Sequence, residues 1–412
     1  MPRMPKVILL IESSRASGRA LLRGIADYSR HHGPWSFSWA PAGMEKIQPL
    51  LETGDADGII LRDIEQAEEI AAYGLPTVVV GHRNTEISGL VNVVTDSKAI
   101  GRVGADHLVG CGFKHFAYCG YEKSLMGNTT WSDVRREFFR HRVRAAGFEN
   151  PPQFALSMQG KDWSREWRLL ANWLKALPKP VGVMTCNDDC GQRLMEVCKL
   201  TGLTVPDEVG VLGVDNDEVV CGLTDPPMSS IAIHFERAGY DAANALNGLM
   251  RRSRNVPSRI IAAVAHVAAR RSTDFVATED VHLAKALQFI RDQSRRRCIS
   301  VDEVAGCAGL SRRMLESRFR KLLGRSVLDE IRRLRIDQIA QLLVETDLPV
   351  AQIAELLGFA DRGHIARYFR AGKGVSPLAY RKTYGSEQVK SWCSENGDSF
   401  PQSGVVSSVH QS

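Results

Sequence analysis

Several charged side chains in the first two thirds of this chain stand where small-molecule pockets form in many α/β proteins. Asp188 and Asp215 each follow a short apolar segment, and Arg135 stands early in a helical stretch. Carboxylates accept hydrogen bonds from neighbouring hydroxyl groups, and a guanidinium group donates them in pairs. These residue types suit the capture of a hydroxyl-rich small molecule, provided that the fold brings the ends of the apolar segments together.

The same acidic residues could instead belong to a cluster of carboxylates that binds a metal. Residues 188–189 are Asp-Asp, and residues 215–218 are Asp-Asn-Asp-Glu. The sequence has no Gly-x-x-x-x-Gly-Lys-Ser/Thr loop, no Gly-x-Ser-x-Gly motif and no His-Glu-x-x-His motif. Its nine cysteines include no Cys-x-x-Cys pair, which is the minimal spacing of many zinc and redox sites. We therefore expect no enzymatic activity, no metal and no other cofactor.

Positive charge is concentrated near the C-terminus. The 412 residues carry a formal net charge of +6, but residues 281–385 alone hold 20 Lys and Arg against 11 Asp and Glu, a net charge of +9. A basic block of domain size indicates a polyanionic partner, with nucleic acid first. A solvated basic surface without any partner is the alternative that charge alone leaves open.

Residues 6–275 alternate between short apolar runs and amphipathic helical stretches. Several of the runs, such as 7–11 and 77–80, are continuously apolar, as is typical of parallel strands covered by helices on both faces. The expected strands are 6–11, 35–39, 57–61, 77–81, 115–119, 181–185 and 209–214. This alternation predicts a doubly wound α/β fold with two lobes, whose ligand lies in the crevice at the carboxyl ends of the strands.

The basic block contains an internal repeat. Segments 301–311 and 350–359 share one template of small and apolar residues that ends in a glycine turn, and a second helix follows each. A short helix, a turn with glycine and a second helix make a helix-turn-helix unit. Because two copies lie about 50 residues apart inside the block of net charge +9, the repeat favours DNA as the polyanion.

Residues 281–384 resemble the AraC/XylS family of transcription regulators, above all in Gly358-Phe359, Phe369 and 374–377. The resemblance implies that helices 312–323 and 361–373 enter successive major grooves of operator DNA, about 34 Å apart, with Phe319 and Phe369 in the cores. A solvated helix face or simple phosphate contact is the alternative for the basic residues. The DNA-binding set implied by the resemblance is Arg312, Arg313, Glu316, Ser317, Arg320, Lys321, Arg362, His364, Arg367 and Arg370.

The first 275 residues resemble the sugar-binding core of LacI/GalR regulators and periplasmic sugar-binding proteins, in segments 105–112, 187–188 and 205–215. The combination of this core with an AraC-type block resembles regulators of the xylose-operon type. One departure is Ser17-Gly18, where that type carries larger polar side chains. For Arg135 and Asp215 the alternative is a structural salt bridge between the lobes, and Trp131 and Trp163 could stack on a sugar or belong to the core. The ligand set implied by the resemblance is Arg19, Arg135, Asn187, Asp188 and Asp215.

Together these features predict a periplasmic-binding-protein-like sensor over 1–275, an AraC-type DNA-binding domain over 276–385 and a disordered tail over 386–412. We expect a sugar-responsive transcription regulator, with a pentose such as xylose as effector and DNA as partner. A homodimer is expected, and contact with RNA polymerase is possible in this class. Only about five apolar residues, 7–11, precede Glu12, too few for a signal peptide, so we expect a cytoplasmic protein. The alternatives are a ligand-independent architectural DNA-binding protein and a sugar-binding protein without regulatory output.

Overall fold

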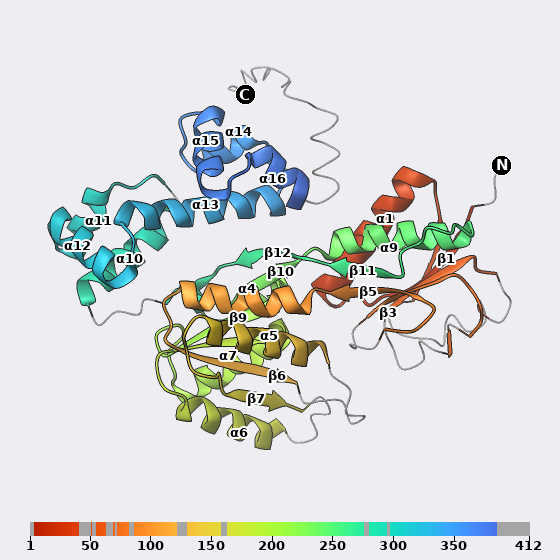
Figure 1. The fold of residues 1–412 in the computed structure, drawn as a ribbon, viewed down its shortest axis with the longest axis horizontal. Helices are drawn as coiled ribbons and strands as arrows, with labels where there is room; N and C mark the ends of the chain where they lie inside the picture. The colour runs from red at the N-terminus through yellow and green to blue at the C-terminus, as the bar shows by residue number, and fades with distance from the viewer. Residues whose placement is uncertain are drawn as a thin grey trace, which may run out of the picture. The chain divides into compact units, whose positions relative to one another are not determined.

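The structure is a computed structural model that describes residues 4–40, 51, 55–62, 69–70, 72–81, 86–121, 130–157, 163–275, 280–294 and 297–384 (Figure 1). The chain forms two compact units. The first holds residues 1–293 and 299–331, and the second holds residues 294–298 and 332–412. The expected tail, 386–412, lies outside the described residues, as does the connection 276–279 next to the expected domain boundary.

The first lobe is built on a six-stranded sheet with the strand order β11-β5-β4-β3-β1-β2, in which every pairing of the described strands is parallel. Its strands are β1 (Lys6–Leu10), β2 (Ser36–Trp39), β3 (Gly58–Arg62), β4 (Thr77–Val80), β5 (Val91–Thr95) and β11 (Arg259–Ala262). Val7 and Leu9 of β1 belong to one apolar core, and Ile8 and Leu10 belong to another. Both faces of this strand are therefore buried, as its continuous apolar run predicts.

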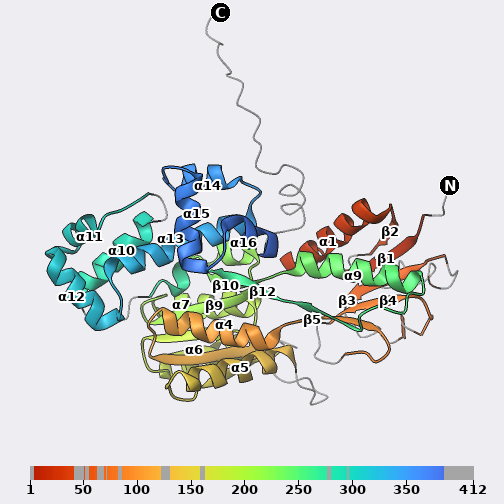
Figure 2. The ribbon, with the colours of Figure 1, turned by 45° about the horizontal axis from the view of Figure 1, so that its top comes forward.

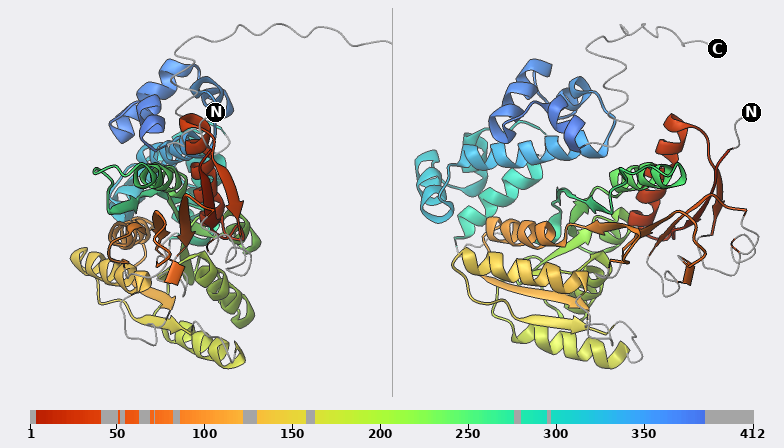
Figure 3. Two further views of the ribbon diagram at one scale, coloured as in Figure 1. Left: turned by 90° about the vertical axis from the view of Figure 1, so that its right-hand side faces the viewer. Right: turned by 45° about the vertical axis from the view of Figure 1, so that its right-hand side comes forward.

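Two helices lie side by side in the first lobe although about 200 residues separate them in the sequence: α1 (Ala16–His32) and α9 (Phe235–Met250) (Figure 3). Gly24 and Gly239 allow this close approach. A Cβ atom at Gly24 would lie 1.9 Å from the carbonyl oxygen of Glu236, and one at Gly239 would lie 2.2 Å from that of Leu21. The two glycines thus set the distance between the helix backbones.

The second lobe has a six-stranded sheet with the order β12-β10-β9-β8-β6-β7, parallel except for the antiparallel pair of β10 and β12. Its strands are β6 (His115–Tyr121), β7 (Gln153–Leu156), β8 (Val181–Thr185), β9 (Val209–Asp215), β10 (Ser229–Ile233) and β12 (Val264–Ala268). Its helices include α4 (Ser97–Gly110) and α5 (Trp131–Ala145), which lie side by side (Figure 2), together with α6 (Trp163–Ala176) and α7 (Asp188–Thr201).

The chain crosses between the lobes after β5, after β10 and after β11. The two-lobed α/β architecture predicted from the sequence is confirmed, but five strands go beyond the expected ones: β5, β7, β10, β11 and β12. Residues 259–268 show why such strands are hard to predict. They form one nearly continuous apolar run in the sequence, and yet β11 pairs in the first sheet and β12 in the second.

After the two sheets, the part of the chain whose described elements are all helices begins at α10 (Val281–Ser294). In the first unit α11 (Val301–Ala308) and α12 (Arg312–Leu323) follow it. Ser300 and Glu303 form a capping box at the start of α11, since the Ser300 hydroxyl accepts from Glu303 N and the Glu303 side chain accepts from Ser300 N. Gly309 ends α11 with a φ of 65°, a left-handed conformation that favours glycine. This is the turn of the first helix-turn-helix unit.

The remaining helices are α13 (Val327–Glu345), α14 (Val350–Leu356), α15 (Arg362–Lys373) and α16 (Pro377–Tyr384). In the second unit Ile339, Ile353, Ile365 and Phe369 form the buried core around which α13 to α15 pack. The turn between α14 and α15 contains Gly358, with a φ of 67°. Among the described residues, no helix is both long and apolar enough to cross a membrane.

Candidate effector pocket and DNA-reading helices

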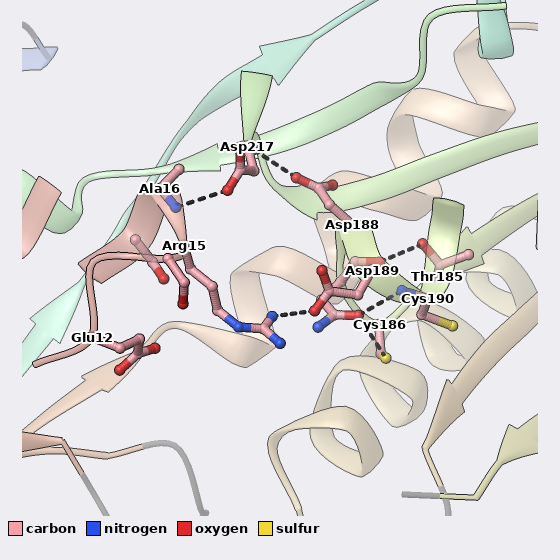
Figure 4. Close-up of polar contacts among 12 residues, drawn as sticks. Glu12, Arg15, Ala16, Thr185, Cys186, Asp188, Asp189, Cys190 and Asp217 are labelled. Carbon is pink, nitrogen blue, oxygen red and sulfur yellow. Dashed lines mark hydrogen bonds and ion pairs between the residues drawn. The ribbon is translucent and has the colours of Figure 1, made fainter. Parts of the chain in front are cut away.

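The predicted ligand residues gather around the carboxyl ends of strands from both lobes of the first unit, as the sequence predicts for a doubly wound fold. From the first lobe come the loop after β1 and Arg62 at the end of β3. From the second lobe come the start of α7 after β8 and the loop after β9. Figure 4 shows the side chains of the β1 loop and of α7 pointing toward one another.

Asp215 is the residue whose setting most resembles a ligand site. It ends β9 with a φ of 106°, a backbone conformation that costs energy for a residue other than glycine. Burial raises the pKa of its carboxyl group, although Arg135, Arg62 and Arg15 act in the opposite direction. Within the described part of the chain its carboxylate accepts no hydrogen bond. Both of its oxygens are thus left able to accept hydrogen bonds from hydroxyl groups of a ligand, in the field of three guanidinium groups.

Arg135 lies on α5 and is only 3% exposed. One terminal nitrogen donates to the carbonyl oxygen of Cys186, and the other donates to Oγ1 of Thr95 over 3.4 Å. Its Nε is buried and has no hydrogen-bond partner among the described residues. The guanidinium carbon lies 4.4 Å from the ring centroid of Trp131, so this tryptophan contacts Arg135, while the side chain of Trp163 is not described.

The salt-bridge alternative for Arg135 and Asp215 finds no support in the described residues. Both side chains belong to the second lobe, so a pair between them could not join the lobes. The described ion pairs do not include one between these two residues. Their interaction is electrostatic at longer range, through the effect of Arg135 on the pKa of Asp215.

Asp188 and Asn187 are engaged by the protein itself. Oδ2 of Asp188 accepts from the backbone N of Asp217 over 2.7 Å, and Oδ1 accepts from Oγ of Ser230 over 2.5 Å. Burial and the nearby Asp215 raise the pKa of Asp188 well above its ordinary value. Oδ1 of Asn187 caps α7 by accepting from N of Cys190. Both side chains therefore hold the loops of the pocket in place.

Arg19 also makes contacts within the protein. Its Nη1 donates to the carbonyl oxygens of Ser13 and Ser14 over 2.9 Å each, which fixes the loop between β1 and α1. Its Nη2 lies 3.7 Å from Oδ1 of Asp217 in the other lobe. Its side chain is 39% exposed, so it lies at the solvent-facing edge of the candidate site.

Contacts that the sequence pattern does not reveal join the two lobes. Arg15 forms an ion pair with Asp189, and the backbone N of Ala16 donates to Oδ2 of Asp217 over 2.8 Å (Figure 4). In the first lobe, Arg62 donates to Oε1 of Glu12 over 2.5 Å. The rule that ligands sit at the carboxyl ends of parallel strands would have identified all of these positions. Their pairing could not be foreseen.

The carboxylates near the pocket do not form a metal site in the described structure, where no group of three or more His, Cys, Asp or Glu residues could hold an ion. Cys119, Cys186 and Cys190 are buried, and burial raises the pKa of the latter two thiols well above the ordinary value. These cysteines are packed as small apolar groups.

The first predicted reading helix, α12, begins at the cap Ser311 and buries Leu315 and Phe319. Its exposed face carries most of the predicted DNA contacts, and Arg312 also lies 3.2 Å from Asp302. Glu316, a member of the predicted DNA-binding set, is half-buried, and its Oε2 is buried without a hydrogen-bond partner among the described residues. The exposed residues of the predicted set on this helix are Arg312, Arg313, Ser317, Arg320 and Lys321.

The second predicted reading helix, α15, is capped by Asp361 and buries Ile365 and Phe369, the latter in the position predicted for it. His364 is exposed beside Phe359, with 5.2 Å between the ring centroids. Arg362 is half-buried. The other predicted residues of this helix, Arg367 and Arg370, are exposed.

Comparison with known proteins agrees with both halves of this description. Residues 105–273 match a family described as a periplasmic binding protein-like domain, and residues 304–383 match a helix-turn-helix domain. The xylose operon regulatory protein of Escherichia coli strain K12 is 26% identical over 383 residues, which cover 91% of this chain and 96% of the relative. The xylose operon regulatory protein of Haemophilus influenzae is 24% identical over 382 residues, covering 91% and 98%.

Among solved structures, that of a xylose-binding transcription activator superposes with a TM-score of 0.60 at 25% identity and covers 93% of this chain and 99% of its own. A periplasmic-binding-protein-like sensor joined to a helix-turn-helix domain defines a ligand-responsive transcription regulator that binds DNA. This chain is similar to xylose operon regulatory proteins over most of its length.

Proposed function

We propose that this regulator senses a pentose, with D-xylose as the first candidate, in the pocket around Asp215. The observation that carries the proposal is the half-buried Asp215 carboxylate, which accepts no hydrogen bond among the described residues and lies among the charges of Arg135, Arg62 and Arg15. Adjacent sugar hydroxyls would donate to its two oxygens. The xylose named for the two regulators and the activator of similar length supports the choice of sugar.

The remaining residues of the ligand set divide into two roles under this proposal. Arg135 would donate its Nε, which is buried without a partner among the described residues, to a sugar oxygen. Asp188 and Asn187 would position the loops, since their oxygens already accept hydrogen bonds. Arg19 would act at the rim, where its side chain is partly exposed. The sensor would extend over 1–275 and the DNA-binding domain over 276–385.

The DNA-binding half would read operator DNA with α12 and α15. Arginine matches the two acceptors of guanine in the major groove, and Arg312, Arg313 and Arg367 are exposed on these helices. Residues later on the helices, such as Lys321 and Arg370, would contact phosphates. We further infer a homodimer that acts in the cytoplasm and binds paired half-sites.

A thermal-unfolding screen of the full chain with pentoses and hexoses tests the effector. A ligand that binds only the folded protein stabilises it by RT ln(1 + [L]/Kd), about 2.7 kcal/mol at 100 times Kd. We expect D-xylose to raise the melting temperature and hexoses to have a smaller effect. No shift with any sugar would refute the proposal and favour a ligand-independent DNA-binding protein.

DNA binding in the same samples separates this function from the third possibility, a sugar-binding protein without regulatory output. A duplex selected by the full chain from a random pool should change its affinity when D-xylose is added. Stabilisation by the sugar with no such selection of DNA would show that the sensor works without a regulatory role.

A further inference from the structure

The helix α10, which leads into the first helix-turn-helix unit, is held by one buried arginine. Arg291 of α10 is 8% exposed. Its Nη1 donates to the carbonyl oxygen of Asp274 over 2.7 Å, its Nη2 donates to that of Phe275 over 2.5 Å, and its Nε lies 2.6 Å from Oδ1 of Asp274. We call these three residues the Arg291 clamp. All the nitrogens of one planar group thus bind two consecutive residues, so α10 cannot rotate without breaking several charged hydrogen bonds.

The sensor end of the clamp is itself fixed to the second sheet. Phe275 is buried and stacks on Phe113, with 4.2 Å between the ring centroids. Phe113 fills the space left by Gly210 of β9, where a Cβ atom would lie 2.2 Å from the phenylalanine ring. Just before the clamp is the 3-10 turn η2 (Arg271–Thr273), where Ser272 Oγ donates to the carbonyl oxygen of Val211 in β9 over 2.6 Å.

The same segment reaches the pocket through Arg270. Its Nη2 donates to Oδ1 of Asn216 over 2.8 Å, and its Nη1 donates to the carbonyl oxygen of Met228 over 3.0 Å. Asn216 directly follows Asp215, and both have a positive φ, 54° and 106° respectively. The backbone N of Asn216 donates to Ser230 Oγ. A shift of Asp215 on binding a sugar would therefore change the Arg270 contact, because these neighbours share one strained loop.

Beyond the clamp, α10 is tied to the first reading helix. Arg318 of α12 pairs with Asp280, at the start of α10, over 2.5 Å. Nδ1 of His282 lies 2.7 Å from the carbonyl oxygen of Ala308 at the end of α11. A displacement of α10 is thus passed to both helices of this helix-turn-helix unit by polar contacts on its first turn.

We propose that Arg270 and the Arg291 clamp couple the effector pocket to the first helix-turn-helix unit. This inference rests on the proposed function, since it names how that pocket regulates DNA binding. Arg270 and Arg291 are positioning residues that belong to neither the predicted ligand set nor the DNA-reading set. Coupling between two sites is a free energy separate from either affinity. Loss of the clamp should therefore abolish the effect of the sugar on DNA affinity, while the protein still binds the sugar and still binds DNA.

The test uses the full chain with Arg291→Met, which keeps an unbranched apolar stem and removes the hydrogen-bond donors of the side chain. D-xylose binding is measured by calorimetry, and DNA binding is measured by anisotropy on a duplex selected from a random pool by the wild type, with and without saturating D-xylose. For the wild type we expect a change in DNA affinity of about 5- to 150-fold. For Arg291→Met we expect less than about 2-fold, with an unchanged sugar Kd and a DNA Kd within the wild-type range, because the two sites are then uncoupled.

Lys285→Met is the matched control, because Lys285 is exposed on the same helix and lies outside the clamp; it should keep the wild-type response. If Arg291→Met does not fold, Arg291→Lys decides, since a lysine keeps the charge but cannot hold both carbonyls and the carboxylate. A wild-type response in either folded variant overturns the coupling. A wild type that binds D-xylose but does not change its DNA affinity also overturns it. A wild type that binds no D-xylose refutes the proposed effector instead, and the sugar found in the thermal screen then replaces it in the same titrations.

Discussion

Replacing Asp215 by asparagine should separate sugar affinity from the stability of the ligand-free protein. The change keeps the shape of the side chain and removes its charge. A hydrogen bond to a charged group contributes about 1.5–3 kcal/mol, so the loss of one such bond to a sugar hydroxyl should weaken binding about 10- to 150-fold. Stability should respond in the other direction. Burial raises the pKa of Asp215 despite three nearby guanidinium groups, so the folded protein disfavours the ionised carboxylate more than the unfolded chain does.

The direction of the pKa shift determines whether the Asp215 carboxyl group raises or lowers the stability of the protein. An acid whose pKa is higher in the folded state lowers stability once the pH rises above its ordinary value of about 4. At pH 7 the neutral asparagine avoids this penalty, so the ligand-free Asp215→Asn variant should be as stable as the wild type or more stable. Calorimetric titration with D-xylose and thermal unfolding without it measure the two quantities.

A suitable control is Asp207→Asn. Asp207 is exposed near the start of β9, at the opposite end of the strand from Asp215, and its replacement should change neither quantity. Sugar affinity of Asp215→Asn within about twofold of the wild type would refute the assignment of this carboxylate to the pocket. A clearly less stable ligand-free variant would show that its main role is to neutralise the guanidinium groups.

Three further predictions concern the same loops and the reading helices. Gly213→Ala should destabilise the fold by about 1–3 kcal/mol in chemical denaturation, because the added Cβ would lie 2.2 Å from Oδ1 of Asp188, which is pinned by two hydrogen bonds; an unchanged midpoint would contradict this. Since burial raises the pKa of Asp188, the free energy of unfolding of the wild type should rise relative to that of Asp188→Asn as the pH falls toward about 4. If the melting temperatures of the two proteins change in parallel between pH 5 and 8, this prediction is wrong. Arg313→Ala should cost about 1–3 kcal/mol on the selected DNA and relax its sequence preference, whereas Lys321→Ala should weaken all sequences alike and lower the salt slope by about one; equal effects on specific and random DNA in competition binding would show phosphate contact alone.

Local pattern was sufficient to predict much of the architecture. The strands around Val7, Val183 and Val211 are recognisable because a parallel strand covered on both faces must be apolar throughout. The ends of the predicted DNA-reading helices are also recognisable from the sequence. The caps Ser311 and Asp361 and the glycine turns each act within a few residues. The place of Asp215 at the carboxyl end of a strand was predictable, because it is a local property.

Interactions between distant parts of the chain depended on the crossings between the lobes. The pairs Arg15–Asp189 and Ala16–Asp217 join residues 174 and 201 positions apart, and no periodicity encodes them. Asp188 has the residue type of a ligand, but only the tertiary structure shows both of its oxygens engaged by Asp217 and Ser230.

The arginines of the basic block also show what only the tertiary structure decides. From the sequence, all of them could equally contact DNA. The fold buries Arg291 against two backbone carbonyls and leaves Arg313 exposed. The sequence alone determined the turns and helices of the basic block and seven of the twelve strands in the described residues, because these depend on contacts between neighbouring residues. The tertiary structure decided which charges bind the protein itself and which remain available to a sugar or to DNA, because that depends on which loops the folded sheets bring together.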